Sequence, residues 1–172
     1  QMHTGMPLDI YLSSSEEIKN VLNKINAERS AIADMLAGLT QGASEAQLME
    51  AISSGSSIVK LVDVVLAQAV RDHASDIHIE PEEDITRIRF RIDGILHEIP
   101  TPPKEWEMAM ISRIKVLSGM DIAESRVPQD GHFQAKIDDK IIDFRVSTVP
   151  TIYGENMVMR ILDTSSVMLG LE

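Results

Sequence analysis

The most regular hydrophobic pattern in this chain lies between residues 56 and 73. Apolar residues recur there at steps of three and four, at Ile58, Leu61, Val62, Val65, Leu66, Ala69 and Val70. This spacing places them along one side of an α-helix. We predict a helix that Ser56 or Ser57 caps at its N-terminus and that buries this side, with His73 packed at the end of the same face.

The periodicity then changes from 3.6 residues to two. The segments "DIHIE" at 76–80 and "ITRIRFRIDGILHEI" at 85–99 alternate apolar and polar residues, with acidic residues at the turn between them. Such alternation predicts two strands, each with one buried face. The polar face of the second strand carries Arg87, Arg89 and Arg91.

More elements follow the prolines of "TPP". A helix is expected from Lys104 to about Ser118, where Gly119 ends it. In "ESRVPQDGHF", Pro128 and the pair Asp130-Gly131 predict a turn. Strands are then expected in "HFQAKI", "IIDFRVSTV" and "NMVMRILD", with a hairpin at 138–139 and a Pro-Tyr-Gly connection. The order α, β, β, α, β, β, β predicts an α+β domain, an antiparallel sheet with helices packed on it.

The segment before residue 56 reads as a short helical arm. "LDIYL" is an isolated strand pattern, and Ser14 with Glu17 forms a capping box in front of an amphipathic helix. We interpret residues 1–27 as the end of a preceding domain, 28–55 as a mobile helical linker, 56–163 as the main domain and 164–172 as an exit linker. The chain is therefore expected to be part of a longer protein.

Composition excludes several classes of protein. With 16 Lys and Arg against 27 Asp and Glu, the net charge of −11 argues against binding nucleic acid over the whole surface. This net charge does not exclude a local basic site on part of the surface. The absence of cysteine excludes disulfides and thiolate zinc sites. No apolar run is long enough to span a bilayer and no signal peptide opens the chain, so a role at a membrane would require recruitment.

Arginines are the main candidates for chemistry. They recur on predicted strands, on a helix and beside the turn, at positions 87, 89, 91, 113, 126, 145 and 160. A guanidinium fork matches phosphate oxygens, so a clustered anion site is one interpretation. The alternative is that each arginine is solvated or paired with a carboxylate.

Other polar residues carry weaker signals. His78 and Glu80 resemble the start of a zinc deaminase motif, but the cysteines of that motif are absent, so no metal is expected and a structural His78 is favoured. The aspartates at positions 76, 93, 130 and 143 are expected to be turn residues or arginine partners. No G-x-x-x-x-G-K-[ST] loop occurs, so this chain alone is not expected to hydrolyse nucleotide.

Five segments resemble, in order, the second N-terminal domain of the hexameric ATPases of type II secretion and type IV pilus assembly. They are "ASDIHIEP", "RFRIDGIL", "SRIKVLSGMDIAE", "RVPQDG" and "DFRVSTVPTIYGENMVMRILD". The resemblance runs from about Ser56 to Leu162, and residues 7–25 look like the end of the preceding domain. It implies a PAS-like fold in a non-catalytic module that mediates subunit assembly and couples ATP hydrolysis to protein export or pilus assembly.

The resemblance also implies partners. They are the ATPase domains of the same and the neighbouring subunit in a homo-hexamer, and the inner-membrane platform and cytoplasmic-ring proteins of the machine, with no nucleic acid. ATP and Mg²⁺ belong to the full-length protein, and no cofactor is expected in this chain alone. The implied location is cytoplasmic, peripheral to the inner membrane. The alternative function is a free-standing PAS-like sensor or adaptor for a small ligand.

By position, the resemblance makes Arg126, Arg145 and Arg160 candidates for contacts with nucleotide phosphates or with the next subunit. Arg89 and Arg91 are weaker candidates, as salt bridges between domains. The usual family turn is Glu-Lys-Arg-Val-Pro-Gln-Asp-Gly-Arg. This chain has Ser125 in place of the Lys and His132 in place of the second Arg. The resemblance therefore carries no phosphate role to position 132, where histidine lacks the permanent charge of arginine.

Overall fold

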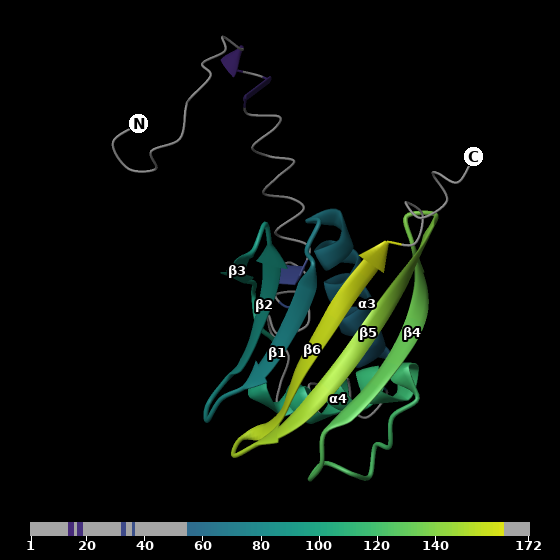
Figure 1. The fold of residues 1–172 in the computed structure, drawn as a ribbon. Helices are drawn as coiled ribbons and strands as arrows, with labels where there is room; N and C mark the ends of the chain where they lie inside the picture. Colours follow the sequence, from purple (N-terminus) through teal and green to yellow (C-terminus); the bar gives the residue numbers. More distant parts are fainter. Residues whose placement is uncertain (1–13, 16, 19–31, 34–35, 37–54, 164–172) are drawn as a thin grey trace, which may run out of the picture.

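The computed structural model describes residues 14–15, 17–18, 32–33, 36 and 55–163 (Figure 1). The predicted capping box is confirmed, because the backbone N–H of Glu17 donates to Ser14 Oγ and that of Ser14 donates to Glu17 Oε2, both at 3.1 Å. Within the predicted linker, Ile32 and Leu36 are helical and buried with the core of the main domain. The rest of the arm and residues 164–172 lie outside the described residues, so the predicted division into four segments stays a prediction.

The main domain is a six-stranded antiparallel sheet with two α-helices on one side (Figure 1). The strand order is β3-β2-β1-β6-β5-β4. The elements are α3 Ser56–Arg71, β1 Asp76–Pro81, β2 Thr86–Ile92, β3 Ile95–Glu98, the 3₁₀ turn η1 Lys104–Trp106, α4 Glu107–Ser118, β4 Gln129–Ile137, β5 Lys140–Thr151 and β6 Gly154–Asp163. The α+β prediction is confirmed. Among the described residues, no helix is long and apolar enough to cross a membrane.

The core lies between the sheet and the helices. The predicted apolar side of α3 is buried, with Leu61, Val65 and Ala69 at most 2% exposed. It faces the alternate strand residues that the period of two picked out, among them Ile77 and Ile79 of β1, both 0% exposed. Apolar burial of this kind contributes about 25 cal/mol per Å², so the alternation of each strand decides which of its faces turns toward the helices.

Both ends of α3 differ from the prediction. Its N-cap is Gly55, with φ 67°, and no side chain caps the helix. His73 is exposed and adopts φ 55°. The helix has already ended at Arg71, and the backbone N–H of Ala74 bonds to the carbonyl of Ala69 as the chain turns toward β1. His73 therefore leaves the helix face on which sequence spacing had placed it.

The segment 85–99 is a hairpin and not one strand. Asp93 and Gly94 both have positive φ, 49° and 81°, and they join β2 to β3 with Ile92 paired to Ile95. Two consecutive left-handed residues match the twist of a tight hairpin, for which Asp-Gly is a favoured pair. The element order is therefore α, β, β, β, α, β, β, β. The helix prediction for residues 104–118 is confirmed in extent, with the first turn as 3₁₀ helix and Gly119 ending α4 at φ 70°.

The predicted turn at Asp130-Gly131 is wrong. Both residues lie in β4, paired with Ser147 and Val146 of β5. A side chain at Gly131 would overlap the carbonyl oxygen of Ser118 and approach Ser118 Cβ to 2.9 Å. Gly131 is thus required by the close approach of the end of α4 to the strand.

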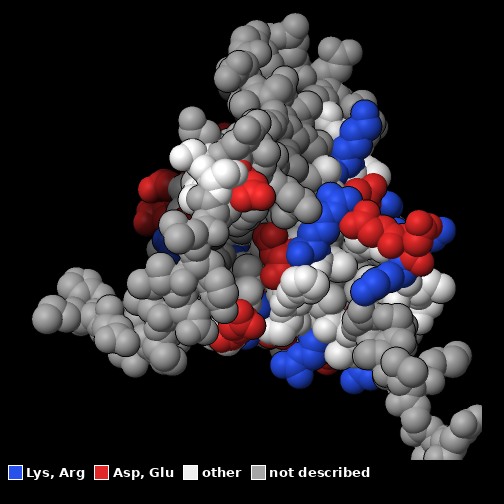
Figure 2. Space-filling view, turned by 90° about the horizontal axis from the view of Figure 1, so that it is seen from above, with Lys and Arg blue, Asp and Glu red and all other residues white. Residues whose placement is uncertain are grey.

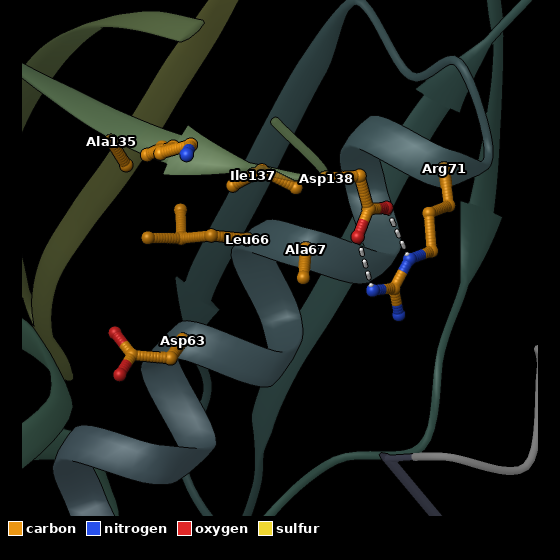
Figure 3. Close-up of a pocket in the computed structure, with 8 residues that line it drawn as sticks. Asp63, Leu66, Ala67, Arg71, Ala135, Ile137 and Asp138 are labelled. Carbon is orange, nitrogen blue, oxygen red and sulfur yellow. Dashed lines mark hydrogen bonds and ion pairs between the residues drawn. The ribbon is translucent and has the colours of Figure 1, made fainter. Parts of the chain in front are cut away.

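The hairpin predicted at 138–139 is confirmed, with Asp138 and Asp139 at φ 47° and 66°. Arg71 at the end of α3 donates to Asp138 at 2.7 and 2.9 Å and so ties the helix to this turn (Figure 3). A pocket of about 370 Å³ lies beside this pair, between α3 and β4. None of the five candidate arginines, at positions 89, 91, 126, 145 and 160, lines this pocket.

Candidate functional site

The sheet face that points away from the helices carries the predicted polar side chains. On β1 it presents Asp76, His78 and Glu80, and on β2 the three arginines that alternate with the buried Thr86, Ile88 and Phe90. We call this surface the polar face. Because every strand pair is antiparallel and in defined register, the side chains that meet across this face follow directly from the pairing.

One row of the polar face gathers most of the candidates. The register pairs Arg91 with Asp76, Asp76 with Arg160, Arg160 with Arg145 and Arg145 with His132. These five residues come from β2, β1, β6, β5 and β4, and we call them the arginine row. The fold therefore brings together Arg91, Arg160 and Arg145, which are up to 69 positions apart in the chain.

Asp76 forms ion pairs with two arginines of this row, Arg91 and Arg160. Its Oδ1 lies 3.1 Å from Arg160 Nε, its Oδ2 lies 3.4 Å from Arg91 Nε, and the hydroxyl of Ser75 donates to it at 2.8 Å. Burial of Asp76 opposes its ionisation, but the hydrogen bonds from Ser75 and Arg160 and the charges of Arg160 and Arg91 outweigh burial, so the pKa of Asp76 lies below its usual value. One ionised carboxylate thus serves two arginines, and Asp76 is an arginine partner as expected.

Arg145 differs from the other arginines of the row. It is exposed, and among the described residues it has no ion pair and no side-chain hydrogen bond. Its register partners on both sides are basic side chains, Arg160 and His132. Beside it lies a depression of about 530 Å³ that Asp130, Asp143 and Ser147 also line. Arg145 can therefore bind an oxyanion from outside the domain without breaking an internal pair.

Arg89 lies one step along β2 and is already occupied. Its Nη2 donates to Glu80 at 2.6 Å, and this hydrogen bond, with smaller effects of the nearby carboxylates, raises the pKa of Arg89. His78 lies between these residues, 3.4 Å from Arg91 Nη2 and 3.8 Å from Glu80. Since a guanidinium can only donate, His78 Nε2 accepts there. Burial first and the Arg91 charge second lower the pKa of His78, which suits the structural role expected for it.

Arg126 lies outside the row, in the loop of residues 119–128 between α4 and β4. Its side chain is 86% exposed, and its Nε and Nη2 donate to the Glu124 carboxylate at 3.1 and 2.8 Å. These bonds and one from the Arg126 backbone N–H lower the pKa of Glu124 to about 2. Arg126 is thus accessible but held by a near neighbour in the chain.

Acidic and basic side chains interleave over the described part of the end of the domain seen in Figure 2. Independently of this view, Arg87, Arg89, Arg91 and Arg160 each form an ion pair with a carboxylate. These four pairs agree with the alternative of paired strand arginines, and the exposed Arg145, unpaired among the described residues, agrees with the solvated arginine that the same alternative allows. Within the described ranges, no group of three or more His, Asp or Glu side chains is arranged to hold a metal ion.

Sequence reasoning missed a buried lysine behind the Arg126 loop. Lys115 is 1% exposed and its Nζ lies 2.6 Å from Glu155 Oε1. The signal was present, because Lys115 follows Ile111 by four residues and Ser118 follows it by three, all on the buried side of α4. A lysine on such a side is rare unless it is paired.

Comparison with known proteins gives a consistent family. The sequence model described as "Type II/IV secretion system protein" matches residues 51–172. Type II secretion system protein E of Xanthomonas campestris pv. campestris is 39% identical over 172 residues, which cover 98% of this chain and 30% of that protein. The type IV pilus assembly ATPase PilB of Pseudomonas aeruginosa is 36% identical over 181 residues, covering 100% and 32%. This chain spans about a third of the length of these relatives.

Among solved structures, the Legionella pneumophila ATPase DotB matches with a TM-score of 0.42 and 19% identity over 67% of this chain and 32% of that one. The pilus retraction motor PilT with bound ADP matches with a TM-score of 0.39 and 19% identity over 56% and 27%. Both likenesses are too distant to carry an argument.

Proposed function

The chain belongs to the type II/IV secretion system protein family, and from this premise we propose that it is a non-catalytic module of a hexameric secretion or pilus-assembly ATPase. In this proposal the module mediates contacts between subunits and contributes arginines to a nucleotide site on another domain. Hydrolysis of ATP there, with Mg²⁺, drives protein export or pilus assembly. The relatives named above are secretion or pilus proteins, which supports this role.

The observation that carries the proposal is the state of Arg145. It is exposed on a sheet whose backbone is paired on both sides of β5, and it has no counter-ion among the described residues. A guanidinium held on a rigid element can stabilise charge that develops on a phosphate when another domain brings the nucleotide to it. We assign the phosphate contact first to Arg145.

Arg126 and Arg160 take different roles in the proposal. Arg126 is exposed on its loop and offers a second contact to phosphate or to the next subunit. Arg160 is paired with Asp76, which it shares with Arg91, so one carboxylate faces two guanidiniums and Arg160 acts mainly through the positive potential that remains beside Arg145. Arg89 and Arg91 already form ion pairs with carboxylates inside the domain. We therefore propose that they contribute less to contacts with a neighbouring domain than Arg126 and Arg145 do.

The implied partners follow from the same premise. They are the ATPase domains of the same and neighbouring subunits, and the inner-membrane platform and cytoplasmic-ring proteins, at the cytoplasmic side of the inner membrane. The alternative, a free-standing sensor for a small ligand, receives less support, because the relatives are about three times as long as this chain and are named for secretion and pilus assembly.

The test is ATP hydrolysis by the full-length protein. We expect Arg145→Ala to lower kcat by about a hundredfold or more, as for other preorganised charge contacts in a transition state. Arg87→Ala is the matched control, since Arg87 lies on the polar face but is paired with Glu82. Normal turnover in a folded, hexameric Arg145→Ala protein would refute the assignment of the phosphate contact.

A further inference from the structure

The loop of residues 119–128 is held by side chains rather than by regular structure. The side-chain amide of Gln129 makes three hydrogen bonds to the backbone of this loop. Its Oε1 accepts from the N–H of Asp121 at 2.9 Å, and its Nε2 donates to the carbonyls of Asp121 at 3.0 Å and Glu124 at 2.8 Å. Gln129 is the first residue of β4, so these bonds tie the loop to the sheet.

A second tether reaches the same carbonyl from the helix. The buried Nζ of Lys115 donates to the carbonyl oxygen of Glu124 at 2.7 Å and pairs with Glu155 of β6 at 2.6 Å. A buried ammonium is costly unless its protons have partners. Lys115 therefore joins α4, β6 and the loop at one point, and the Glu124 backbone is fixed from two directions.

The side chain of Glu124 extends this arrangement to Arg126. Its carboxylate accepts from the backbone N–H, Nε and Nη2 of Arg126. An arginine that is 86% exposed ordinarily has much rotamer freedom, and confining it has an entropic cost. Here a bidentate carboxylate sets its direction, while Nη1 has no bond to Glu124 and is free to contact a ligand.

We infer that Gln129, Lys115 and Glu124 are positioning residues that aim the Arg126 guanidinium at a phosphate group outside the domain. The inference rests on the proposed function for its ligand, but the fixed direction of Arg126 is a property of this chain alone. It explains why the segment "RVPQDG" needs a glutamine, which no turn requires. The chain of contacts runs from Glu155 through Lys115 and Glu124 to Arg126.

The first experiment is a double-mutant cycle on ATP hydrolysis by the full-length protein. Gln129→Met removes the three amide bonds at nearly constant volume, and Gln134→Met is the matched control, since Gln134 is exposed on the same strand. We expect Gln129→Met to lower kcat by about tenfold, with the same split between kcat and KM as Arg126→Ala, and Gln134→Met to have no effect. In an Arg126→Ala background, Gln129→Met should change kcat less than about twofold.

Equal effects of Gln129→Met with and without Arg126 would overturn the inference, as would normal turnover in Gln129→Met. If Arg126→Ala itself leaves hydrolysis unchanged, the phosphate role of Arg126 in the proposed function fails instead, and a second readout then decides the positioning claim. That readout is the initial rate of tryptic cleavage at the Arg126–Val127 bond of the folded protein.

Release of the loop should raise the cleavage rate by about tenfold in Gln129→Met, because local opening becomes easier, and leave it unchanged in Gln134→Met. Equal rates in both variants and the parent protein would overturn the positioning claim whatever the ATPase results are.

Discussion

Arg145 and Arg160 are direct partners in the register of β5 and β6, although both carry a positive charge. Like charges that face each other across two strands are destabilising. Here Asp76 on the next strand accepts from Arg160, so part of the repulsion is offset on one side of the pair. The result is an asymmetric pair, with one arginine paired to a carboxylate inside the domain and the other available to an external anion.

This arrangement predicts that Asp76 stabilises the fold. We expect Asp76→Asn to reduce the free energy of unfolding by about 1–2 kcal/mol near pH 7, because the side chain is 9% exposed and its charge-assisted bonds to Arg160 and Arg91 weaken. Urea unfolding measures this difference. Asp93→Asn is the matched control, since Asp93 lies in a turn with positive φ, which Asn also tolerates.

The ion pairs of Asp76 with Arg160 and Arg91 also make the stability of the fold depend on pH. The pKa of Asp76 is lower in the folded state than the ordinary value of 3.8, so its contribution is present above pH 3.8 and is lost as the pH falls through the folded value. The stability difference between the parent protein and Asp76→Asn should therefore shrink in strong acid. A difference that stays constant down to the lowest pH at which the protein is folded would contradict this prediction.

The Glu124–Arg126 pair predicts an unusual carboxyl titration. The Glu124 side-chain carboxyl carbon, followed by NMR, should titrate with a midpoint at about 2 in the parent protein. In Arg126→Ala the midpoint should rise toward the ordinary value of 4.5, because the side-chain bonds that favour the ionised form are gone. Arg87→Ala should leave the midpoint unchanged. An ordinary midpoint in the parent protein would show that the pair does not persist in solution.

Gly131 predicts a cost for even a small side chain. Gly131→Ala places a Cβ against the Ser118 carbonyl, which is backbone and cannot move without shifting the end of α4. We expect a loss of about 1–3 kcal/mol in the free energy of unfolding, typical of overpacking. Gln134→Ala on the same strand is the control and should change stability by less than about 0.5 kcal/mol. A Gly131→Ala protein as stable as this control would refute the close approach.

Several features of the fold were predictable from the chain alone. The 3.6-residue period of 58–70 and the period of two in 76–80 and 86–92 each identified an element and its buried side, since burial of apolar area selects one face. The hairpin at 138–139 and the end of α4 at Gly119 were predictable from residues that adopt positive φ. The hairpin at Asp93-Gly94 was missed although the chain carries two signals for it: Asp-Gly is a favoured hairpin pair, and the alternation of residues 86–92 breaks at the consecutive apolar residues Ile95 and Leu96.

What sequence by itself determined is that a line of arginines occupies one face of an antiparallel sheet and that Arg126 lies beside a chain reversal. Only the tertiary structure decided which of these arginines are free. Strand register placed Asp76 between Arg91 and Arg160 and left Arg145 beside two basic partners, and packing of α4 on β4 placed Lys115 and Gln129 against the Arg126 loop. The physical reason is that alternation is a local property of one strand, whereas the partner of a charge depends on contacts between segments far apart in the chain.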